Sequence, residues 1–194
     1  MMRVHIVAGN LCDFPGDAIV NACNPAMLGG GGVDGAIHRA AGPELKEACK
    51  MVWADENGVR CPTGVVRPTP AFNLPCKWVI HTAGPIFELQ RSAGRARVGE
   101  ETDLSTHAAE VVLRQCFSRA AGMASVMGLR SIAFPAISTG VYGCPQETCA
   151  RVAAEWAKDY PTKLWLDVWF YIYPSEHLGT WMRVFEDTRV EFER

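Results

Sequence analysis

Short apolar runs alternate with helical patterns along this chain, and that alternation limits its fold more than any other feature of the sequence. Runs rich in β-branched residues predict strands at residues 4–7, 18–22, 65–67, 78–82, 131–134 and 167–173. The spacing of apolar residues, with prolines at helix starts, predicts helices at 33–41, from 43, at 102–127, from 145 and at 177–189. Because several strands are apolar throughout, both faces of their sheet must be covered. We therefore expect an α/β fold, a three-layer α/β/α sandwich with a mixed, mostly parallel central sheet.

The length and charge of the chain exclude several classes of protein. Its 194 residues suit one compact domain that buries enough surface to fold unaided, so we expect a single domain over residues 1–194. A formal net charge of −2 gives no extended positive field, which makes nucleic acid an unfavoured partner. There is no apolar run long enough to span a membrane, and no signal-peptide core follows Met1 and Met2. We expect a cytoplasmic monomer that does not bind membranes.

The cysteines and histidines are not arranged as a disulfide framework or a metal site. Eight cysteines are scattered at positions 12, 23, 49, 61, 76, 116, 144 and 149, and none forms a C-x-x-C pair. The five histidines lie far apart in the sequence. We therefore expect reduced thiols, no bound metal and no cofactor.

Residues 21–35 contain four consecutive glycines between a predicted strand and a predicted helix. Glycines cost backbone entropy and add no packing, so such a loop indicates positive φ angles or very close approach by a ligand. The helix that begins near Val33 adds unpaired N–H groups and the positive end of its dipole at the same place. This combination suits a phosphate group.

A second loop of similar character, residues 135–143, follows the strand predicted at 131–134 and precedes the helix that Pro145 opens. Its backbone donors should face the carboxyl edge of the sheet, where ligands bind in open α/β folds. Each loop taken alone is also explained as a tight strand-to-helix turn. Together the two loops could hold a diphosphate from both sides.

Three familiar motifs do not account for these loops. The glycine run lacks the Gly-Lys-Ser/Thr ending of a P-loop, which argues against ATP hydrolysis. Gly30, Gly32 and Gly35 match G-x-G-x-x-G, but they lie too far from the strand end and no strand with a terminal acid follows, so we treat the match as accidental. The serine-hydrolase elbow, G-x-S-x-G, does not occur, and Ser138 lacks that flanking pattern.

The sequence resembles the MacroD-type branch of the macrodomains. Three segments carry the resemblance: residues 21–42 with the four glycines, Val-Asp-Gly and His-Arg-Ala-Ala-Gly; residues 134–140, Phe-Pro-Ala-Ile-Ser-Thr-Gly; and residues 80–85, Ile-His-Thr-Ala-Gly-Pro. The likeness extends from about residue 3 to 174. It implies an ADP-ribose-binding hydrolase that removes mono-ADP-ribose from acidic side chains of proteins and also deacetylates O-acetyl-ADP-ribose. The implied partner is ADP-ribose or an ADP-ribosylated protein.

The resemblance also implies roles for individual residues. Asn24 and Asp34 correspond to the residues that orient the distal ribose and the attacking water, and we expect them to be catalytic. The expected ligand-binding set comprises Asn10, Leu11, Ala22, Asn24, Gly31, Gly32, Val33, Asp34, Ser138, Thr139, Gly140, Val141, Tyr142 and Tyr173. Within it, the N–H groups of residues 31–33 and 138–142 would hold the diphosphate, and the ring of Tyr142 would lie against the distal ribose.

The residue types suit this chemistry, because an amide donates to and accepts from ribose hydroxyls while a carboxylate deprotonates water. Simpler interpretations exist for each residue taken alone. Asn24 could cap its loop, and Asp34 could be a first-turn acid that complements a helix dipole. His38, one turn after Asp34, would support the loop, tune the carboxylate or serve only as a structural histidine.

Residue 10 departs from the family pattern. The family usually has Gly-Asp-Ile after the first strand, with the aspartate accepting a hydrogen bond from the adenine amino group, whereas this chain has Gly9, Asn10 and Leu11. A neutral amide is a weaker acceptor than a carboxylate, by on the order of 1 kcal/mol. Adenine selectivity is therefore open. Tyr173, at the end of the last predicted strand, either packs on the face of the adenine or belongs to the hydrophobic core.

Two functions share this pocket: the hydrolase, which the pair Asn24 and Asp34 favours, and a non-catalytic ADP-ribose reader. Residues 88–101 are short of apolar side chains and contain Arg91, Arg95 and Arg97. We expect them to form an exposed connection, with a partner contact as the alternative.

Overall fold

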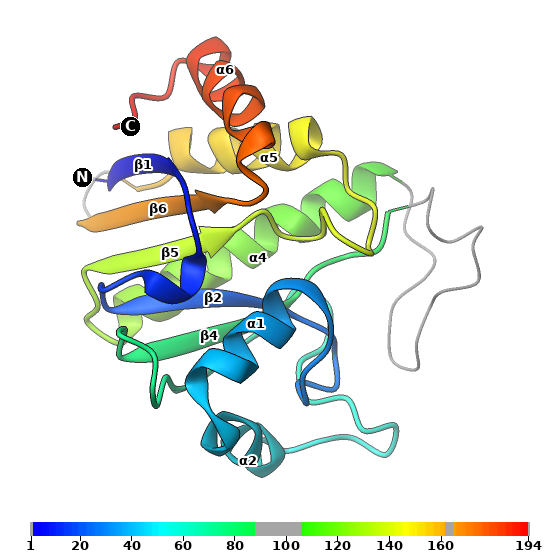
Figure 1. Ribbon diagram of the computed structural model, residues 1–194. Helices are drawn as coiled ribbons and strands as arrows, with labels where there is room; N and C mark the ends of the chain where they lie inside the picture. Colours follow the sequence, from blue (N-terminus) through cyan, green and yellow to red (C-terminus); the bar gives the residue numbers. More distant parts are fainter. Residues whose placement is uncertain (1, 88–105, 162–164, 194) are drawn as a thin grey trace.

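The computed structural model describes residues 2–87, 106–161 and 165–193, which form a sheet between two layers of helices (Figure 1). The sheet has six strands in the order β1-β6-β5-β2-β4-β3. Their bounds are β1 Met2–Ala8, β2 Ala18–Cys23, β3 Val66–Pro70, β4 Trp78–Ala83, β5 Ser131–Pro135 and β6 Leu166–Ile172. All neighbouring strands pair in parallel except β3, which pairs antiparallel with β4. The predicted α/β/α sandwich with a mixed, mostly parallel sheet is therefore confirmed.

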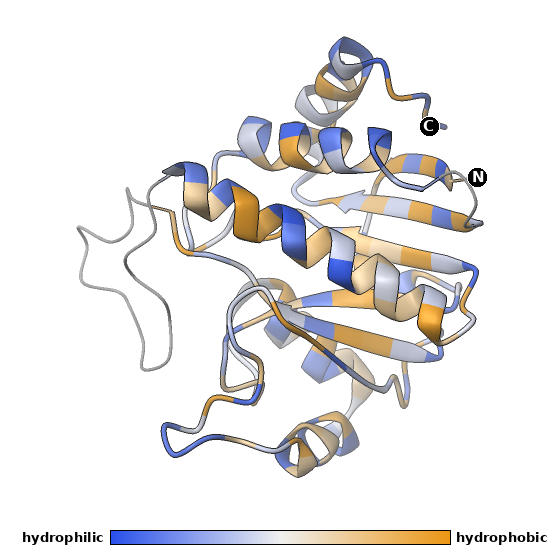
Figure 2. Ribbon diagram, turned by 180° about the vertical axis from the view of Figure 1, so that it is seen from behind, coloured by the Kyte–Doolittle hydropathy of each residue, from blue (hydrophilic) through white to orange (hydrophobic). Residues whose placement is uncertain are grey.

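The helices divide between the two faces of the sheet. The first layer contains α1 Gly32–Ala41 and α2 Pro43–Met51, and the second contains α4 Thr106–Val126 and α5 Gln146–Lys158 (Figures 1 and 2). α6 Leu178–Thr188 packs on α5 and on β1. Two short 3-10 helices complete the chain, η1 Leu11–Asp13 and η2 Ser175–His177. In the described part of the chain, no helix is both long enough and apolar enough to cross a membrane.

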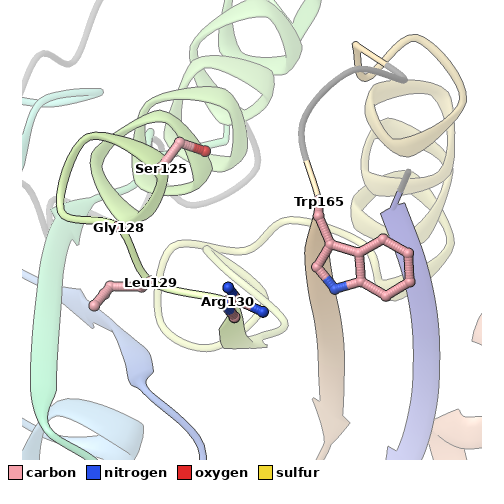
Figure 3. Close-up of a pocket in the computed structure, with 5 residues that line it drawn as sticks. All are labelled: Ser125, Gly128, Leu129, Arg130 and Trp165. Atoms are coloured by element: carbon pink, nitrogen blue, oxygen red, sulfur yellow. The ribbon is translucent and has the colours of Figure 1, made fainter.

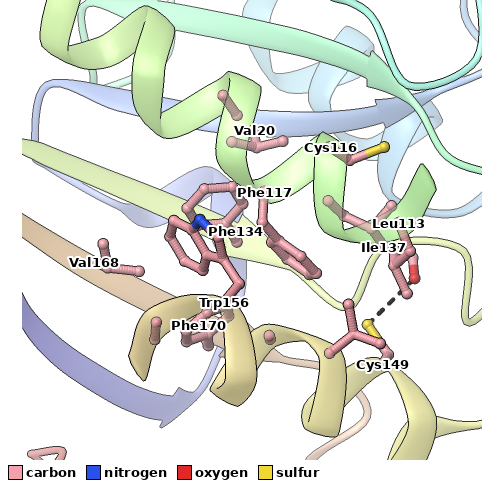
Figure 4. Packing of buried hydrophobic residues seen from close by; sticks show 14 of the residues in the cluster. Val20, Leu113, Cys116, Phe117, Phe134, Ile137, Cys149, Trp156, Val168 and Phe170 are labelled. Atoms are coloured by element: carbon pink, nitrogen blue, oxygen red, sulfur yellow. Dashed lines mark hydrogen bonds between the residues drawn. The ribbon is translucent and has the colours of Figure 1, made fainter. Parts of the chain in front are cut away.

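Alternate residues of each strand pack into different layers. Ile19 and Ala133 pack beneath α1 and α2, whereas their neighbours Val20 and Phe134 pack beneath α4 and α5. The second layer is the more aromatic: Phe117, Phe134, Phe170 and Trp156 lie in ring contact there (Figure 4). This period of two explains why both faces of the sheet had to be covered.

Strand β3 was predicted at residues 65–67, whereas the structure extends it from Val66 to Pro70. Pro68 and Pro70 concealed this strand, because proline lacks the N–H group that a central strand needs. β3 lies at the edge of the sheet and pairs only with β4. On its other side there is no strand to which the missing N–H groups would have to donate.

Other boundaries shift by small amounts. The helix predicted at 102–127 is α4, described from Thr106 to Val126; residues 102–105 and the connection at 88–101 lie outside the described residues. β6 ends at Ile172, so Tyr173 follows the strand rather than closing it. α6 begins at Leu178, after η2. All eight cysteines are free and buried, as expected for reduced thiols.

The parallel register brings the carboxyl ends of five strands to one edge of the sheet. Two connections at this edge matter most. We call residues 24–31, between β2 and α1, the glycine loop, and residues 136–145, between β5 and α5, the serine loop. β2 and β5 are adjacent in the sheet, so the two loops leave the same edge side by side.

Candidate active site

A cavity of about 930 Å³ lies at this edge, between the glycine loop and the serine loop. It is lined by every residue of the predicted ligand-binding set: Asn10, Leu11, Ala22, Asn24, Gly31, Gly32, Val33, Asp34, Ser138, Thr139, Gly140, Val141, Tyr142 and Tyr173. These residues come from four stretches of the chain, residues 10–11, 22–34, 138–142 and 173. The structure therefore brings the whole predicted set to one place.

Further lining residues were not predicted: Gly9, Cys23, Gly30, Ala36, Arg39, Gly84, Ile86, Pro135, Ala136 and Tyr171. Two of them had a usable signal. Tyr171 lies on β6 two residues before the predicted Tyr173, next to the carboxyl end of the strand. Gly84 directly follows β4, which ends at the same edge. Arg39 had no such signal, because its position depends on the packing of α1 against η1.

The glycine loop presents backbone donors to the cavity. Gly29 and Gly32 have φ of 91° and 58°, which explains why this loop requires glycine. α1 begins at Gly32 without any side-chain cap on its first turn. The N–H groups of residues 31–33 consequently have no acceptor within the described residues. A helix start of this kind is suited to an anion.

The serine loop is held in a tight turn by its own backbone. Ser138 has a φ of 65°, and its carbonyl accepts a hydrogen bond of 2.9 Å from the Cys144 N–H group. The N–H groups of Gly140 and Val141 have no partner within the described part of the chain. The Thr139 N–H group instead makes a turn bond of 3.4 Å to the Ala136 carbonyl, so it is less available than predicted.

Gly84 controls how closely the serine loop can approach β4. A Cβ atom at position 84 would collide with Ser138 Oγ and would lie 2.8 Å from Ile137 Cγ2. Ser138 Oγ is itself buried and has no hydrogen-bond partner within the described residues. The loop is thus pressed against a position where only glycine fits.

Asn24 and Asp34 converge above Gly30. A Cβ atom built on Gly30 would lie 3.0 Å from Asp34 Oδ2 and 3.3 Å from Asn24 Nδ2. Asn24 also caps its own loop, because its Oδ1 accepts from the Ala26 N–H group at 3.1 Å. Asn24 Nδ2 donates to the Gly29 carbonyl at 3.3 Å, so both ends of the amide cap the loop and the capping interpretation is correct. The second hydrogen of Nδ2 is left for a ligand in the cavity that Asn24 lines.

Asp34 is only 3% exposed, and its two carboxylate oxygens have different surroundings. Oδ1 accepts a hydrogen bond of 2.7 Å from Asn21 Nδ2 and lies 3.5 Å from His38 Nε2. Oδ2 has no partner within the described residues. Burial raises the pKa of Asp34, opposed by the Asn21 hydrogen bond and by the nearby His38 ring. Asp34 does lie in the first turn of α1, as the simpler interpretation expects. It also has one held oxygen and one oxygen free of protein partners, which is the arrangement that a general base needs.

The opposite end of the cavity contains Asn10 and two tyrosines. Asn10 Oδ1 accepts a hydrogen bond of 3.2 Å from the Cys12 N–H group and so caps η1. The amide NH₂ of Asn10, rather than its oxygen, is left for a ligand. Tyr173 is 79% exposed and lines the cavity, which excludes the core position considered for it.

A second, smaller hollow of about 300 Å³ lies at the amino edge of the sheet (Figure 3). Ser125, Gly128, Leu129, Arg130 and Trp165 line it. Its lining combines the cation of Arg130, the indole of Trp165 and the hydroxyl of Ser125, and no site residue was predicted there. Within residues 2–87, 106–161 and 165–193, no group of three or more His, Cys, Asp or Glu residues could hold a metal ion.

Known proteins share this sequence and this fold. The sequence profile of the Macro domain family matches residues 20–153. An O-acetyl-ADP-ribose deacetylase of Escherichia fergusonii is 41% identical over 184 residues, 94% of each chain. Among solved structures, the Oceanobacillus iheyensis macrodomain with ADP has a TM-score of 0.81 at 35% identity, covering 94% of this chain and 89% of that one. The Trypanosoma brucei macrodomain in complex with ADP-ribose has a TM-score of 0.71 at 33% identity, covering 93% and 68%. This chain therefore belongs to the macro domain family.

Proposed function

We propose that this protein is a hydrolase that binds ADP-ribose, removes mono-ADP-ribose from acidic side chains of proteins and deacetylates O-acetyl-ADP-ribose. The observation that carries the proposal is the approach of both Asp34 Oδ2 and Asn24 Nδ2 to the same residue, Gly30, inside a cavity flanked by two loops with unpaired N–H groups. The relative named as an O-acetyl-ADP-ribose deacetylase and the solved macrodomains with ADP and ADP-ribose support it.

In this proposal the ligand lies across the cavity with its diphosphate between the loops. The N–H groups of residues 31–33 and those of Gly140 and Val141 donate to the phosphate oxygens. The distal ribose then lies toward Asn24 and Asp34. The base lies at the other end, toward Leu11 and Tyr173, where the cavity offers apolar and aromatic surface.

The reaction is the hydrolysis of an ester on the distal ribose. Asp34 Oδ2 accepts a proton from a water molecule, whose oxygen bonds to the acyl carbon. The bond between that carbon and the ribose oxygen breaks, and the ribose oxygen leaves as a hydroxyl group after taking the proton from Asp34, whose carboxylate is thereby restored. Asn24 Nδ2 donates to a ribose hydroxyl and fixes the position of the sugar. Burial, which raises the pKa of Asp34, makes its ionised form a stronger base.

A non-catalytic ADP-ribose reader would use the same cavity but would have no use for the free Asp34 oxygen. The deciding experiment incubates the purified chain with a protein ADP-ribosylated on aspartate or glutamate, and separately with O-acetyl-ADP-ribose. We expect release of ADP-ribose from both substrates. Tight binding of ADP-ribose by calorimetry without any release would identify a reader instead.

We further propose that residues 1–194 form one domain, which acts as a cytoplasmic monomer. Alignment of 94% of the chain with a solved macrodomain supports the single domain. Eight free thiols are consistent with a reducing compartment. Size-exclusion chromatography with light scattering tests the monomer, since a mass near twice 21.2 kDa would contradict it.

A further inference from the structure

A buried polar pair lies beneath α1, in a layer that is otherwise mostly apolar. Asn21 on β2 and His81 on β4 are direct register partners in the parallel pairing of these strands. Both side chains are fully buried, and both face the side of the sheet that α1 and α2 cover. Buried polar groups destabilise a core unless they are hydrogen-bonded, so this pair requires an explanation.

The contacts of the Asn21 amide determine where the His81 ring holds its proton. Asn21 Nδ2 lies 2.7 Å from Asp34 Oδ1 and 3.1 Å from His81 Nδ1. An amide nitrogen is a donor with two hydrogens, so it can donate to both atoms. The flipped amide would place its oxygen against the Asp34 carboxylate, where two acceptors would repel each other. His81 Nδ1 is therefore an acceptor and has no proton.

The other ring nitrogen of His81 completes the assignment. Burial, with a smaller effect from His38, lowers the pKa of His81 to about 3, so the ring is neutral at physiological pH. A neutral imidazole has one N–H group, which must then be at Nε2. Thr69 Oγ1 lies 2.9 Å from Nε2 and accepts this hydrogen bond. Hydrogen bonds thus run from His81 to Thr69 and from Asn21 to both His81 and Asp34.

This arrangement is poor for stability alone. Asn21 Oδ1 and Asp34 Oδ2 are both buried without a partner within the described residues. An unsatisfied buried acceptor is destabilising, and apolar side chains of similar shape would avoid it. Polar groups that are kept at this cost point to a function for Asp34 Oδ2, the unpartnered oxygen of the residue that lines the cavity.

We propose that His81 is a positioning residue: as the neutral Nε2–H tautomer it fixes the Asn21 amide, which holds Asp34 Oδ1 and leaves Oδ2 directed at Gly30 and the cavity. The inference rests on the proposed role of Asp34 as the base. Without an acceptor at His81 Nδ1, the Asn21 amide could rotate and release the carboxylate. Asp34 would then lose the hydrogen bond that opposes the effect of burial on its pKa.

Other titratable groups also face this network, and they define what a pH profile can report. They are His38 on α1, Cys49 on α2, Cys23 at the end of β2 and Cys61 ahead of β3. Burial raises the pKa of Cys49 to about 11, and a hydrogen bond with Cys61 together with burial raises that of Cys23, so both thiols stay protonated at neutral pH. The acidic limb of the activity profile therefore reports chiefly on Asp34.

The first test uses the wild-type protein. Nitrogen-15 NMR of the histidine rings distinguishes a protonated from an unprotonated ring nitrogen. We expect the His81 ring to have a proton on Nε2 and none on Nδ1, unchanged across the neutral pH range. A proton on Nδ1, or titration of this ring near neutral pH, would overturn the inference without affecting the proposed function.

The second test uses a pair of amide variants. In His81→Asn the new amide oxygen can occupy the position of Nδ1 and accept from Asn21, whereas in His81→Gln the amide reaches the position of Nε2 and contacts Thr69 only. We expect His81→Gln to lower kcat about tenfold or more, with the Kd for ADP-ribose changed less than about twofold. The acidic limb of its profile of kcat against pH should move to higher pH. His81→Asn should retain kcat within about threefold, and the acidic limb of its pH profile should stay at the wild-type pH.

The control is His5→Gln, the same change at another buried histidine, which stacks on Trp169 away from the cavity. It should lower the melting temperature without changing kcat or the pH profile. Equal loss of kcat in His81→Asn and His81→Gln, or a change confined to KM, would overturn the positioning role. A wild-type protein that binds ADP-ribose but releases none from either substrate would overturn the hydrolase proposal instead.

Discussion

The glycine loop and the serine loop face one cavity but present different groups to it. The glycine loop and the helix it begins bring two polar side chains, Asn24 and Asp34, together above Gly30. The serine loop offers mainly backbone, because Ser138 Oγ is turned toward Gly84 and Val141 is 71% exposed. Under the proposed function, the two loops share the binding of a diphosphate, while bond cleavage belongs to the glycine loop and its helix alone.

The layers beneath the loops differ in the same way. Under the glycine loop the Asn21 amide and the His38 ring contact the carboxylate of Asp34. In the serine loop the side chain of Ile137 is fully buried in the apolar layer that contains the aromatic cluster, and Cys149 Sγ donates to the Ile137 carbonyl at 3.3 Å (Figure 4). Polar support orients a reacting side chain, whereas apolar support fixes a backbone turn.

The largest effect should come from Asp34→Ala, which removes the reacting group from the glycine loop. We expect turnover to fall at least about a hundredfold, roughly 2.7 kcal/mol, while the Kd for ADP-ribose stays within about tenfold. Release assays and calorimetry on the same preparation measure the two quantities. Asp187→Ala, which removes an exposed carboxylate on α6, is the control and should not change turnover. Unchanged turnover in Asp34→Ala would remove the assignment of the base.

A change under the serine loop should affect binding instead. In Gly84→Ala the new methyl group meets Ser138 Oγ and Ile137 Cγ2, so the loop must shift away from β4. We expect the Kd for ADP-ribose to rise about tenfold, roughly 1.4 kcal/mol. Gly122→Ala in α4 is the matched control, because its Cβ would meet nothing within 4 Å. An unchanged Kd in Gly84→Ala would mean that the serine loop does not hold the ligand.

A smaller effect should appear in stability. The pKa of Asp34 is raised above its unfolded value of 3.8, so the folded protein binds this proton more tightly and stability falls as the pH rises through the raised pKa. The ionised carboxylate is therefore destabilising at neutral pH. We expect Asp34→Asn to melt about 2 to 4 °C higher at pH 7, on the order of 1 kcal/mol, and to be inactive. The difference in melting temperature should vanish in acid, where both side chains are neutral. Equal melting temperatures at pH 7 would contradict the raised pKa.

The sequence was sufficient for the fold and for the backbone elements of the site. Four glycines before a helix, and a second loop at the same strand edge, predicted a cavity that the structure forms. Two kinds of feature could not be predicted. The contact between Asn21 and Asp34 depends on how α1 packs over β2, which periodicity does not define. The edge strand β3 was truncated because prolines are rare in strands, and only its place in the sheet makes them acceptable.

If binding is spread over the backbone of both loops, a side chain outside them should change affinity only slightly. Asn10 tests this, because its oxygen already accepts from the Cys12 N–H group and its NH₂ would face an adenine amino group donor to donor. In Asn10→Asp one carboxylate oxygen can retain the cap while the other accepts from the base. We expect ADP-ribose to bind about fivefold more tightly, just under 1 kcal/mol, by calorimetry. The analogue with hypoxanthine in place of adenine should weaken instead, since its carbonyl oxygen is an acceptor that the Asn10 NH₂ suits. Equal shifts for both ligands would mean that residue 10 does not contact the base, and that the loops alone account for binding.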